Sequence, residues 1–259
     1  VGSTTAMSGA FFTDLFGSNT ADIDVRALLH GYNLMSWDHE TGTYQINDSV
    51  VAGMAVSKDA QNNRVYTFDL YGDLKFSDGS AITAKDYAFS ILLTASPELA
   101  KLGGQSAAVG AILGMDAYQS GKSSVLRGVR LLSDTQMSIT ISKAYEPYFY
   151  EMALFDYSPY PISVLAPGCK VVDTEKGVGI VNASGTGAAI FTAALLQKTI
   201  LDAATGYMSH PSVVSGPYTL TRYDAQSGTA SFAINPYYKG NEDGEKPTIE
   251  TIVYRSVAN

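Results

Sequence analysis

The stretch between residues 64 and 95 is the most strongly patterned part of the sequence, and it constrains the fold more than any other feature. At its start, polar and apolar residues alternate so that Tyr66, Phe68 and Leu70 share one face. A period of two over a short run is typical of a β-strand buried on one side. The chain then reaches Ser77–Gly79, whose Ser-Asp-Gly sequence indicates a turn. Any fold of this chain must therefore bury one face of a strand here.

A helix start follows this turn. Thr83 is a good N-cap residue, and Asp86 stands three residues later, which makes a capping-box pattern. Apolar residues then recur on one helical face, at Tyr87, Ala88, Ile91, Leu92 and Ala95. Next, Ser96 and Pro97 indicate a second short helix with proline at its first position. Strand, turn and capped helix thus predict a mixed architecture.

The rest of the chain contains both helix-like and strand-like patterns, and they do not follow one another in strict turn. Helices are expected at Asp22–His30, ended by a C′ glycine at Gly31, at Ala188–Ala204, and from Pro147 onward. Residues 168–187 are glycine-rich and show no clear period. Strand-like runs close the chain, at residues 218–223, 229–234 and 249–257. These elements predict a mixed α/β or α+β fold.

Composition excludes several classes of function. The formal net charge is −8, and lysine and arginine form no cluster, which argues against a nucleic-acid binder. No apolar run is long enough to span a membrane, so we expect the chain as given to be soluble. Cys169 is the single cysteine, so it forms no intrachain disulfide and supplies no zinc site alone.

Sequences that resemble catalytic or cofactor motifs are incomplete. Gly121-Lys122-Ser123 lacks the earlier glycine of a phosphate-binding loop, because Asp116 stands there. The glycine pairs at 177–179 and 185–187 each lack the third glycine of a dinucleotide-binding motif. Asp38 begins a loop that lacks the glycine and the final glutamate of a calcium site. The histidines have no metal-ligand spacing, so we expect no catalytic residue, metal site or cofactor, and no enzyme.

The patterned region also carries a resemblance to a known family. Tyr66–Leu70, Leu74–Ser80 and Thr83–Ser90 resemble the strand, turn and capped helix of family 5 extracellular solute-binding proteins. Ser215–Leu220 resembles the Gly-Pro-Tyr strand of that family, and Asn235–Gly240 resembles its Asn-Pro-x-Tyr turn. The matches occur in the order that the family requires.

The resemblance implies a periplasmic-binding-protein-like fold of type II. It implies that residues 1–46 and 166–259 form most of a first lobe and that residues 47–165 form an accessory domain. Family members are considerably longer, so the chain is expected to be their N-terminal portion, with the second lobe absent. The implied function is binding of peptides or similar solutes outside the cytoplasm and delivery to an ABC permease. The implied mechanism is hinge closure.

The resemblance also implies a ligand site, although the match is loose there. In the family the first lobe contacts ligand through the segment after its first strand, which here corresponds to Thr5, Met7, Ser8, Gly9, Phe11 and Phe12. Tyr32 and Asn33, after the first helix, are weaker candidates. A periplasmic or lipid-anchored monomer is expected, with no nucleic-acid partner. Two alternatives stay open: a secreted hydrolase acting on peptides or glycans, and a ligand-sensing receptor domain.

Overall fold

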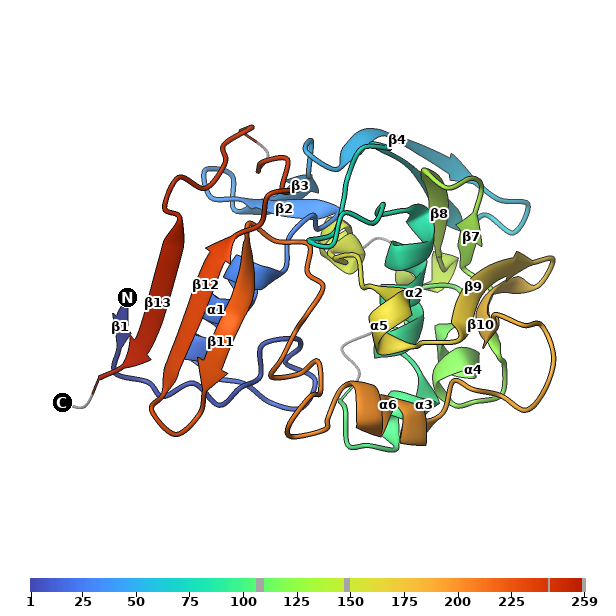
Figure 1. The fold of residues 1–259 in the computed structure, drawn as a ribbon. Coiled ribbons are helices and arrows are strands. Elements are labelled where there is room, and N and C mark those ends of the chain that lie inside the picture. The colour runs from blue at the N-terminus through green and yellow to red at the C-terminus, as the bar shows by residue number, and fades with distance from the viewer. Residues whose placement is uncertain (106–109, 147–149, 242, 258–259) are drawn as a thin grey trace.

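The computed structural model describes residues 1–105, 110–146, 150–241 and 243–257. Figure 1 shows two parts side by side, a sheet that carries both chain ends and a larger part of helices and short sheets. The mixed architecture predicted from the sequence is confirmed. Within the described residues, no helix combines the length and the apolar character needed to cross a membrane.

The sheet near the chain ends has the strand order β1-β13-β12-β11. Its strands are β1 (Gly2–Ser3), β11 (Tyr218–Asp224), β12 (Thr229–Ile234) and β13 (Thr251–Ser256). β1 pairs with β13 in parallel, and the other pairs are antiparallel. The N-terminal segment thus pairs with the last strand of the described chain, although the two lie at opposite ends of the sequence.

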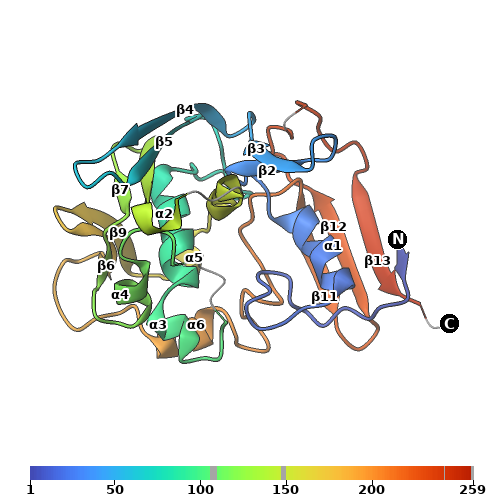
Figure 2. The same ribbon diagram turned by 180° about the vertical axis from the view of Figure 1, so that it is seen from behind.

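Helix α1 (Thr20–Leu29) packs on one face of this sheet, as Figure 2 shows from behind. Asn19 caps it, and His30 is already extended with φ −119° and ψ 129°. The expected left-handed glycine cap at Gly31 is therefore wrong, because the chain leaves the helix in an extended conformation. Gly31 instead packs closely on another glycine, since a Cβ on Gly31 would lie 3.3 Å from the Cα of Gly216.

A second sheet has the strand order β4-β5-β8-β7 and is antiparallel throughout. Its strands are β4 (Val51–Lys58), β5 (Arg64–Leu70), β7 (Val129–Leu131) and β8 (Gln136–Ile141). β5 is the strand predicted from alternation, and its residues Tyr66, Phe68 and Leu70 are all buried. The turn after it carries Gly79 at φ 85°, a left-handed conformation that glycine adopts without strain.

Helix α2 (Ala84–Thr94) is the helix predicted at Thr83. The carboxylate of Asp86 accepts hydrogen bonds from Thr83 N at 2.8 Å and from Thr83 Oγ1 at 2.9 Å. Burial raises the pKa of Asp86 to about 6. Most of the helix is buried, including residues outside the expected apolar face such as Phe89 and Ser90. α2 is therefore a central helix that neighbours cover on several sides.

A third sheet, β6-β10-β9, lies beside α2. It contains β6 (Val125–Leu126), β9 (Cys169–Thr174) and β10 (Gly177–Asn182). β9 and β10 form a hairpin in the glycine-rich region where the sequence shows no period. Helix α6 covers only Ala193–Thr199, much less than the expected span of 188–204. Asn182 instead holds the preceding loop in a non-helical shape, through hydrogen bonds to Thr186 O and Ala188 O.

The remaining elements are short. β2 (Met35–Asp38) and β3 (Thr43–Ile46) pair as a separate hairpin. The short helices are α3 (Pro97–Ala100), α4 (Met115–Gln119), α5 (Ile162–Leu165), and the 3₁₀ turns η1 (Lys143–Tyr145) and η2 (Glu151–Phe155). Pro147, the expected start of an aromatic helix, lies outside the described residues.

The segments that carry the family resemblance meet in space. The side chain of Asn235, which is buried, donates from Nδ2 to Gly216 O at 2.8 Å. Ser77, before the Asp-Gly turn, donates its N–H to Val214 O at 2.8 Å and accepts from Val214 N at 3.0 Å through Oγ. A Cβ on Gly216 would lie 2.5 Å from the carbonyl carbon of Leu29, so only glycine fits against the end of α1. Of these contacts, the pair between Ser77 and Val214 links the two parts of the molecule, and the others fix the end of α1 against the terminal sheet.

Buried apolar residues form two clusters. The smaller lies between α1 and the terminal sheet and includes Met7, Phe11, Val25 and Phe232. The larger surrounds α2 and also takes in residues 169–207, through β9, β10 and α6. The predicted division into residues 1–46 with 166–259, and 47–165, stays a prediction.

Candidate ligand-binding site

The segment Ser8–Phe12 passes beside helix α1, and a buried carboxylate fixes its first residues. Asp22 of α1 is 0% exposed. Its carboxylate accepts hydrogen bonds from Ser8 N at 2.9 Å, from Ser8 Oγ at 2.5 Å and from Gly9 N at 3.2 Å. Hydrogen bonds to a charged group contribute roughly 1.5–3 kcal/mol each. The segment is therefore held in one conformation before it reaches the two phenylalanines.

Phe11 and Phe12 point into different clusters. Phe11 packs edge to face on Tyr223 of β11, with 4.6 Å between ring centroids. Phe12 packs in the larger cluster, 4.7 Å from Tyr160 and 4.9 Å from Tyr207. The Phe11 N–H donates to Met208 O at 2.9 Å. Two adjacent side chains thus anchor the segment to both parts of the molecule.

His30 supports the same segment from the end of α1. Its Nε2 lies 2.9 Å from Phe11 O, so this nitrogen must carry the proton and donate it. Burial lowers the pKa of His30 to about 4, although the hydrogen bond to Phe11 opposes this shift. The imidazole is therefore neutral near pH 7 and serves as a structural hydrogen-bond donor.

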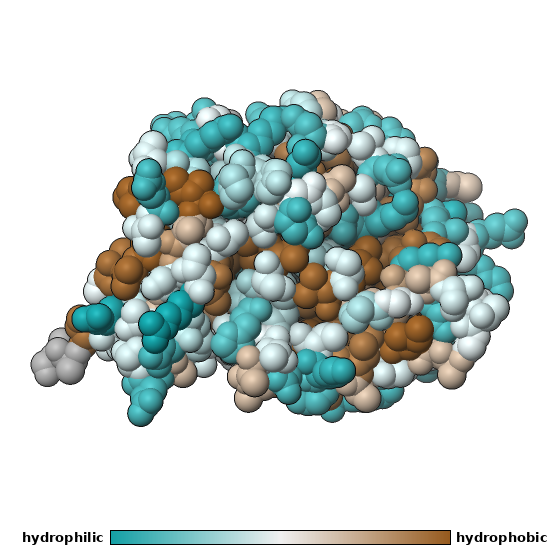
Figure 3. Space-filling model, in the orientation of Figure 1, coloured by the Kyte–Doolittle hydropathy of each residue, from teal (hydrophilic) through white to brown (hydrophobic). Residues whose placement is uncertain are grey.

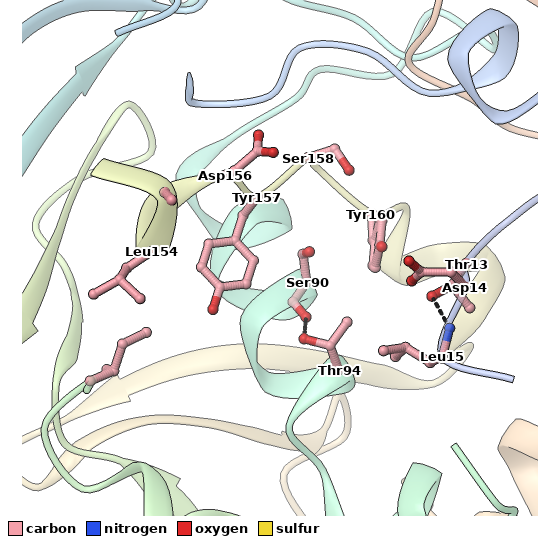
Figure 4. A pocket seen from close by; sticks show the side chains of 12 residues that line it. Thr13, Asp14, Leu15, Ser90, Thr94, Leu154, Asp156, Tyr157, Ser158 and Tyr160 are labelled. Carbon is pink, nitrogen blue, oxygen red and sulfur yellow. Dashed lines mark hydrogen bonds between the residues drawn. The ribbon is translucent and has the colours of Figure 1, made fainter. Parts of the chain in front are cut away.

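A cavity of about 370 Å³ begins where this segment ends. Thr13, Asp14 and Leu15 form one wall (Figure 4). Ser90 and Thr94 of α2 and residues between 153 and 160 form the others. This volume falls within the roughly 300–1,000 Å³ of small-molecule pockets. The anchored segment and the central helix thus enclose a space large enough for part of a ligand.

The cavity is lined by hydrogen-bonding side chains. Burial raises the pKa of Asp156, and a hydrogen bond from Asn33 Nδ2 at 2.7 Å opposes this shift. Burial also raises the pKa of Tyr157 and of Tyr160 to about 12, so both hydroxyls stay protonated at neutral pH. Asp14 is exposed at the opposite wall. Carboxylate acceptors and hydroxyl donors together can bind amide or amine groups.

Tyr32 and Asn33 line a separate hollow of about 250 Å³. Tyr32 is buried, stacks on Tyr238 at 5.1 Å and takes a positive φ of 58°. Its carbonyl accepts from Tyr87 Oη at 2.7 Å, and its hydroxyl accepts from Lys239 N at 2.6 Å. These contacts make Tyr32 a structural residue, whereas Asn33 connects this hollow to the first cavity through its hydrogen bond to Asp156.

The structure therefore separates the residues predicted as ligand contacts. In the described part of the chain, neither cavity is lined by the six residues of the N-terminal segment: Thr5, Met7, Ser8, Gly9, Phe11 and Phe12. Met7, Phe11 and Phe12 are buried in the clusters. Their role in ligand binding stays a prediction.

Several cavity residues escape sequence reasoning. The sequence shows that Tyr157 and Tyr160 lie in a region rich in aromatic residues. Neither alternation nor helical periodicity predicts that this region faces the segment Thr13–Leu15 across a cavity. The two segments are far apart in the chain, and they meet beside α2, where Phe12 packs on Tyr160. Among the described residues, no group of three or more His, Cys, Asp or Glu side chains is placed to hold a metal ion.

Comparison with known proteins gives relatives of one kind. A family model for bacterial extracellular solute-binding proteins, family 5 middle, matches residues 49–259. The chain is 33% identical to the periplasmic oligopeptide-binding protein OppA of Escherichia coli over 111 residues, which are 42% of this chain and 20% of that protein. It is 28% identical to the oligopeptide-binding protein OppA of Lactococcus lactis over 211 residues, which are 80% of this chain and 29% of that protein.

A solved structure of lactococcal OppA, complexed with an endogenous peptide in the closed conformation, has a similar fold. The TM-score is 0.68 at 19% identity, and the match covers 99% of this chain and 41% of that chain. The matched regions thus span less than half of the solved relative and less than a third of each curated one. Since the family model covers most of the sequence, the chain belongs to the family 5 bacterial extracellular solute-binding proteins.

Proposed function

We propose that the protein binds oligopeptides or similar small solutes outside the cytoplasm and delivers them to the permease of an ABC importer. Membership of a solute-binding family supports this, as do the names of its relatives, which are oligopeptide- and dipeptide-binding proteins. Binding would proceed by closure of lobes around the solute, with no bond made or broken. This proposal sets the hydrolase and the sensor aside.

The cavity beside Thr13–Leu15 is the observation that carries the proposal. It is a pocket of ligand size whose walls offer carboxylates and protonated tyrosine hydroxyls. A peptide presents N–H donors and C=O acceptors at regular intervals, and bound peptides are recognised largely through them. Asp156 would accept from a peptide N–H or amine, and the hydroxyls of Tyr157 and Tyr160 would donate to peptide carbonyls.

The predicted N-terminal residues enter this proposal mainly as supports. Asp22 fixes Ser8 and Gly9, and the two phenylalanines fix the backbone that continues into the cavity wall. Asn33 would orient Asp156 through its 2.7 Å hydrogen bond. Thr5 and Met7 would act at most at the edge of the site. We further propose that the protein acts as a monomer and is periplasmic or lipid-anchored.

Calorimetric titration with defined dipeptides to pentapeptides tests the proposal. Asp156→Asn removes the charge and keeps the size of the side chain, and we expect it to weaken peptide binding about tenfold, because a charge-assisted hydrogen bond is replaced by a neutral one. The matched control is Asp48→Asn, which changes an exposed aspartate outside the cavity lining.

The same samples separate binding from hydrolysis. Chromatography after titration should recover each peptide intact. Cleaved peptide would favour the hydrolase. An Asp156→Asn protein that binds peptides as tightly as the parent would show that this cavity is not the site.

A further inference from the structure

The largest hollow that we describe lies away from the proposed peptide site. Its volume is about 690 Å³, and its lining shares no residue with the cavity at Thr13–Leu15. One wall comes from α3, α4 and residues 120–124, and the other comes from β10 and the loop that follows it. Figure 3 shows hydrophobic surface reaching the lower right of the molecule, where Figure 1 places these elements.

Polar atoms in the first wall are used within the protein. Tyr118 Oη donates to Leu92 O at 3.1 Å, so the tyrosine points its hydroxyl toward α2. Ser96 Oγ donates to Leu93 O at 2.8 Å, and Ser123 Oγ donates to Val125 O at 2.7 Å. These three hydroxyls have internal partners, so a ligand without strong hydrogen-bonding groups competes with none of them.

The charged groups of the lining are paired with each other. Lys101 Nζ lies 2.6 Å from Glu98 Oε1, and Glu98 Oε2 accepts from Ala193 N at 2.8 Å. The hydrogen bond from Lys101 lowers the pKa of Glu98. Lys101 and Glu98 are the charged residues of the lining, so its net charge is zero. An ionic ligand would have to compete with an existing ion pair.

The second wall is held in shape before any ligand arrives. The single amide of Asn182 donates to Thr186 O at 2.9 Å and to Ala188 O at 2.8 Å, and it accepts from Ile190 N at 2.9 Å. Gly185 lies within this loop at φ 76°, which favours glycine. A wall that is ordered in advance loses less conformational entropy when a ligand binds.

Apolar side chains complete the hollow. Ile180 and Val181 of β10 reach it from one side, and Pro97 and Phe191 line it as well. Val181 is 37% exposed and contributes apolar surface to the lining. Covering this apolar surface would release water and favour binding.

We propose that this hollow is a second binding site, which takes a small uncharged molecule with an aromatic or branched aliphatic group. Its size, its apolar side chains, its paired charges and its ordered loop all favour such a ligand over an ion. The site does not depend on the peptide-binding proposal, because the two cavities have separate walls.

The neutral dye N-phenyl-1-naphthylamine provides a direct probe, since its fluorescence rises in apolar surroundings. We expect one saturable site with a dissociation constant on the order of 10 µM, which stays within the affinity ceiling for a ligand of this size. The anionic dye 8-anilinonaphthalene-1-sulfonate has a similar ring system and should bind at least tenfold more weakly. Saturating peptide should leave dye binding unchanged.

Two matched pairs of variants locate the dye. Ala189→Trp fills the hollow, whereas Ala183→Trp adds the same bulk to the same loop outside the lining. Val181→Asp places a charge on the apolar wall, and Val253→Asp places one on a comparably exposed valine of β13. The first member of each pair should weaken binding at least tenfold, and the second should leave it within twofold.

Three results would overturn the proposal. One is absence of saturable binding of the neutral dye to the parent protein. Another is equal affinity for the two dyes, which would remove the preference for an uncharged ligand. The third is unchanged binding in both Ala189→Trp and Val181→Asp, which would place the dye elsewhere.

Discussion

Helices α1 and α2 differ in how much of their surface the protein covers, and the difference separates the two parts of the molecule. α1 buries one stripe, with Val25 and Leu29 against the terminal sheet, and leaves Ile23 52% exposed. α2 is covered on several sides by strands and by residues after 150. A helix with one buried stripe can detach from its sheet locally, whereas a central helix can be exposed only when its whole surroundings open.

The segment around Phe11 and Phe12 is one junction between these two environments. Phe11 and Phe12 place adjacent rings in the two clusters. Asp22 and His30, at the two ends of α1, hold the backbone around them. The proposed peptide cavity begins directly after this junction, so its wall depends on both parts being folded.

The largest expected effect tests whether the two clusters are energetically distinct. Phe68 and Phe232 are both 0% exposed, one in each cluster. Phe68→Ala should lower the free energy of unfolding by about 3–5 kcal/mol, measured by urea denaturation, because it leaves a cavity beside the central sheet. Hydrogen exchange in Phe232→Ala should accelerate in β12 and leave β5 protected. Equal acceleration in both strands would show that the clusters open as one unit.

A smaller effect is expected at the junction. Asp22→Asn should lower the free energy of unfolding by about 2 kcal/mol, because an amide cannot accept from all the donors that the carboxylate accepts now. The amides of Ser8 and Gly9 should lose protection from exchange, since both donate to Asp22. Asp48→Asn, at an exposed site, should change neither quantity. Full protection of Ser8 and Gly9 in the variant would contradict the role given to Asp22.

The smallest effect concerns pH. Because the pKa of His30 is about 4 in the folded protein, below its ordinary value of 6.5, the unfolded chain binds a proton between these values and the folded one does not. Stability should therefore fall as pH falls from 6.5 to 4. The raised pKa of Asp86 acts oppositely, since it reduces stability as pH rises toward 6.

Comparison with His30→Gln isolates the histidine contribution, because Asp86 is present in both proteins. The difference in unfolding free energy between parent and variant should change by on the order of 1–2 kcal/mol from pH 6.5 to pH 4.5, in favour of the variant at acid pH. A difference that does not vary with pH would mean that the imidazole has the same pKa in the folded and unfolded states, which contradicts its burial as the cause of a lowered pKa.

Local patterns in the sequence predicted local structure well. The alternation of polar and apolar residues predicted the buried face of β5, and the pairing of Thr83 with Asp86 predicted the start of α2. Both depend on residues a few positions apart, where chain geometry leaves few choices. Sequence patterns did not predict the structure where contacts between distant residues determine it. Residues 169–182 form a hairpin beside α2 without any visible period, and α6 is short because Asn182 holds the loop before it.

The sequence by itself determined the mixed architecture and the family, because turns, helix caps and buried strand faces depend on residues that are close together in the chain. It did not determine the candidate site. Asp156 and the segment Thr13–Leu15 lie more than a hundred positions apart, and only packing around α2 brings them to one cavity. Tertiary structure also decided which of two adjacent phenylalanines enters which cluster, since burial against a distant strand or loop leaves no periodic signal in the residues themselves.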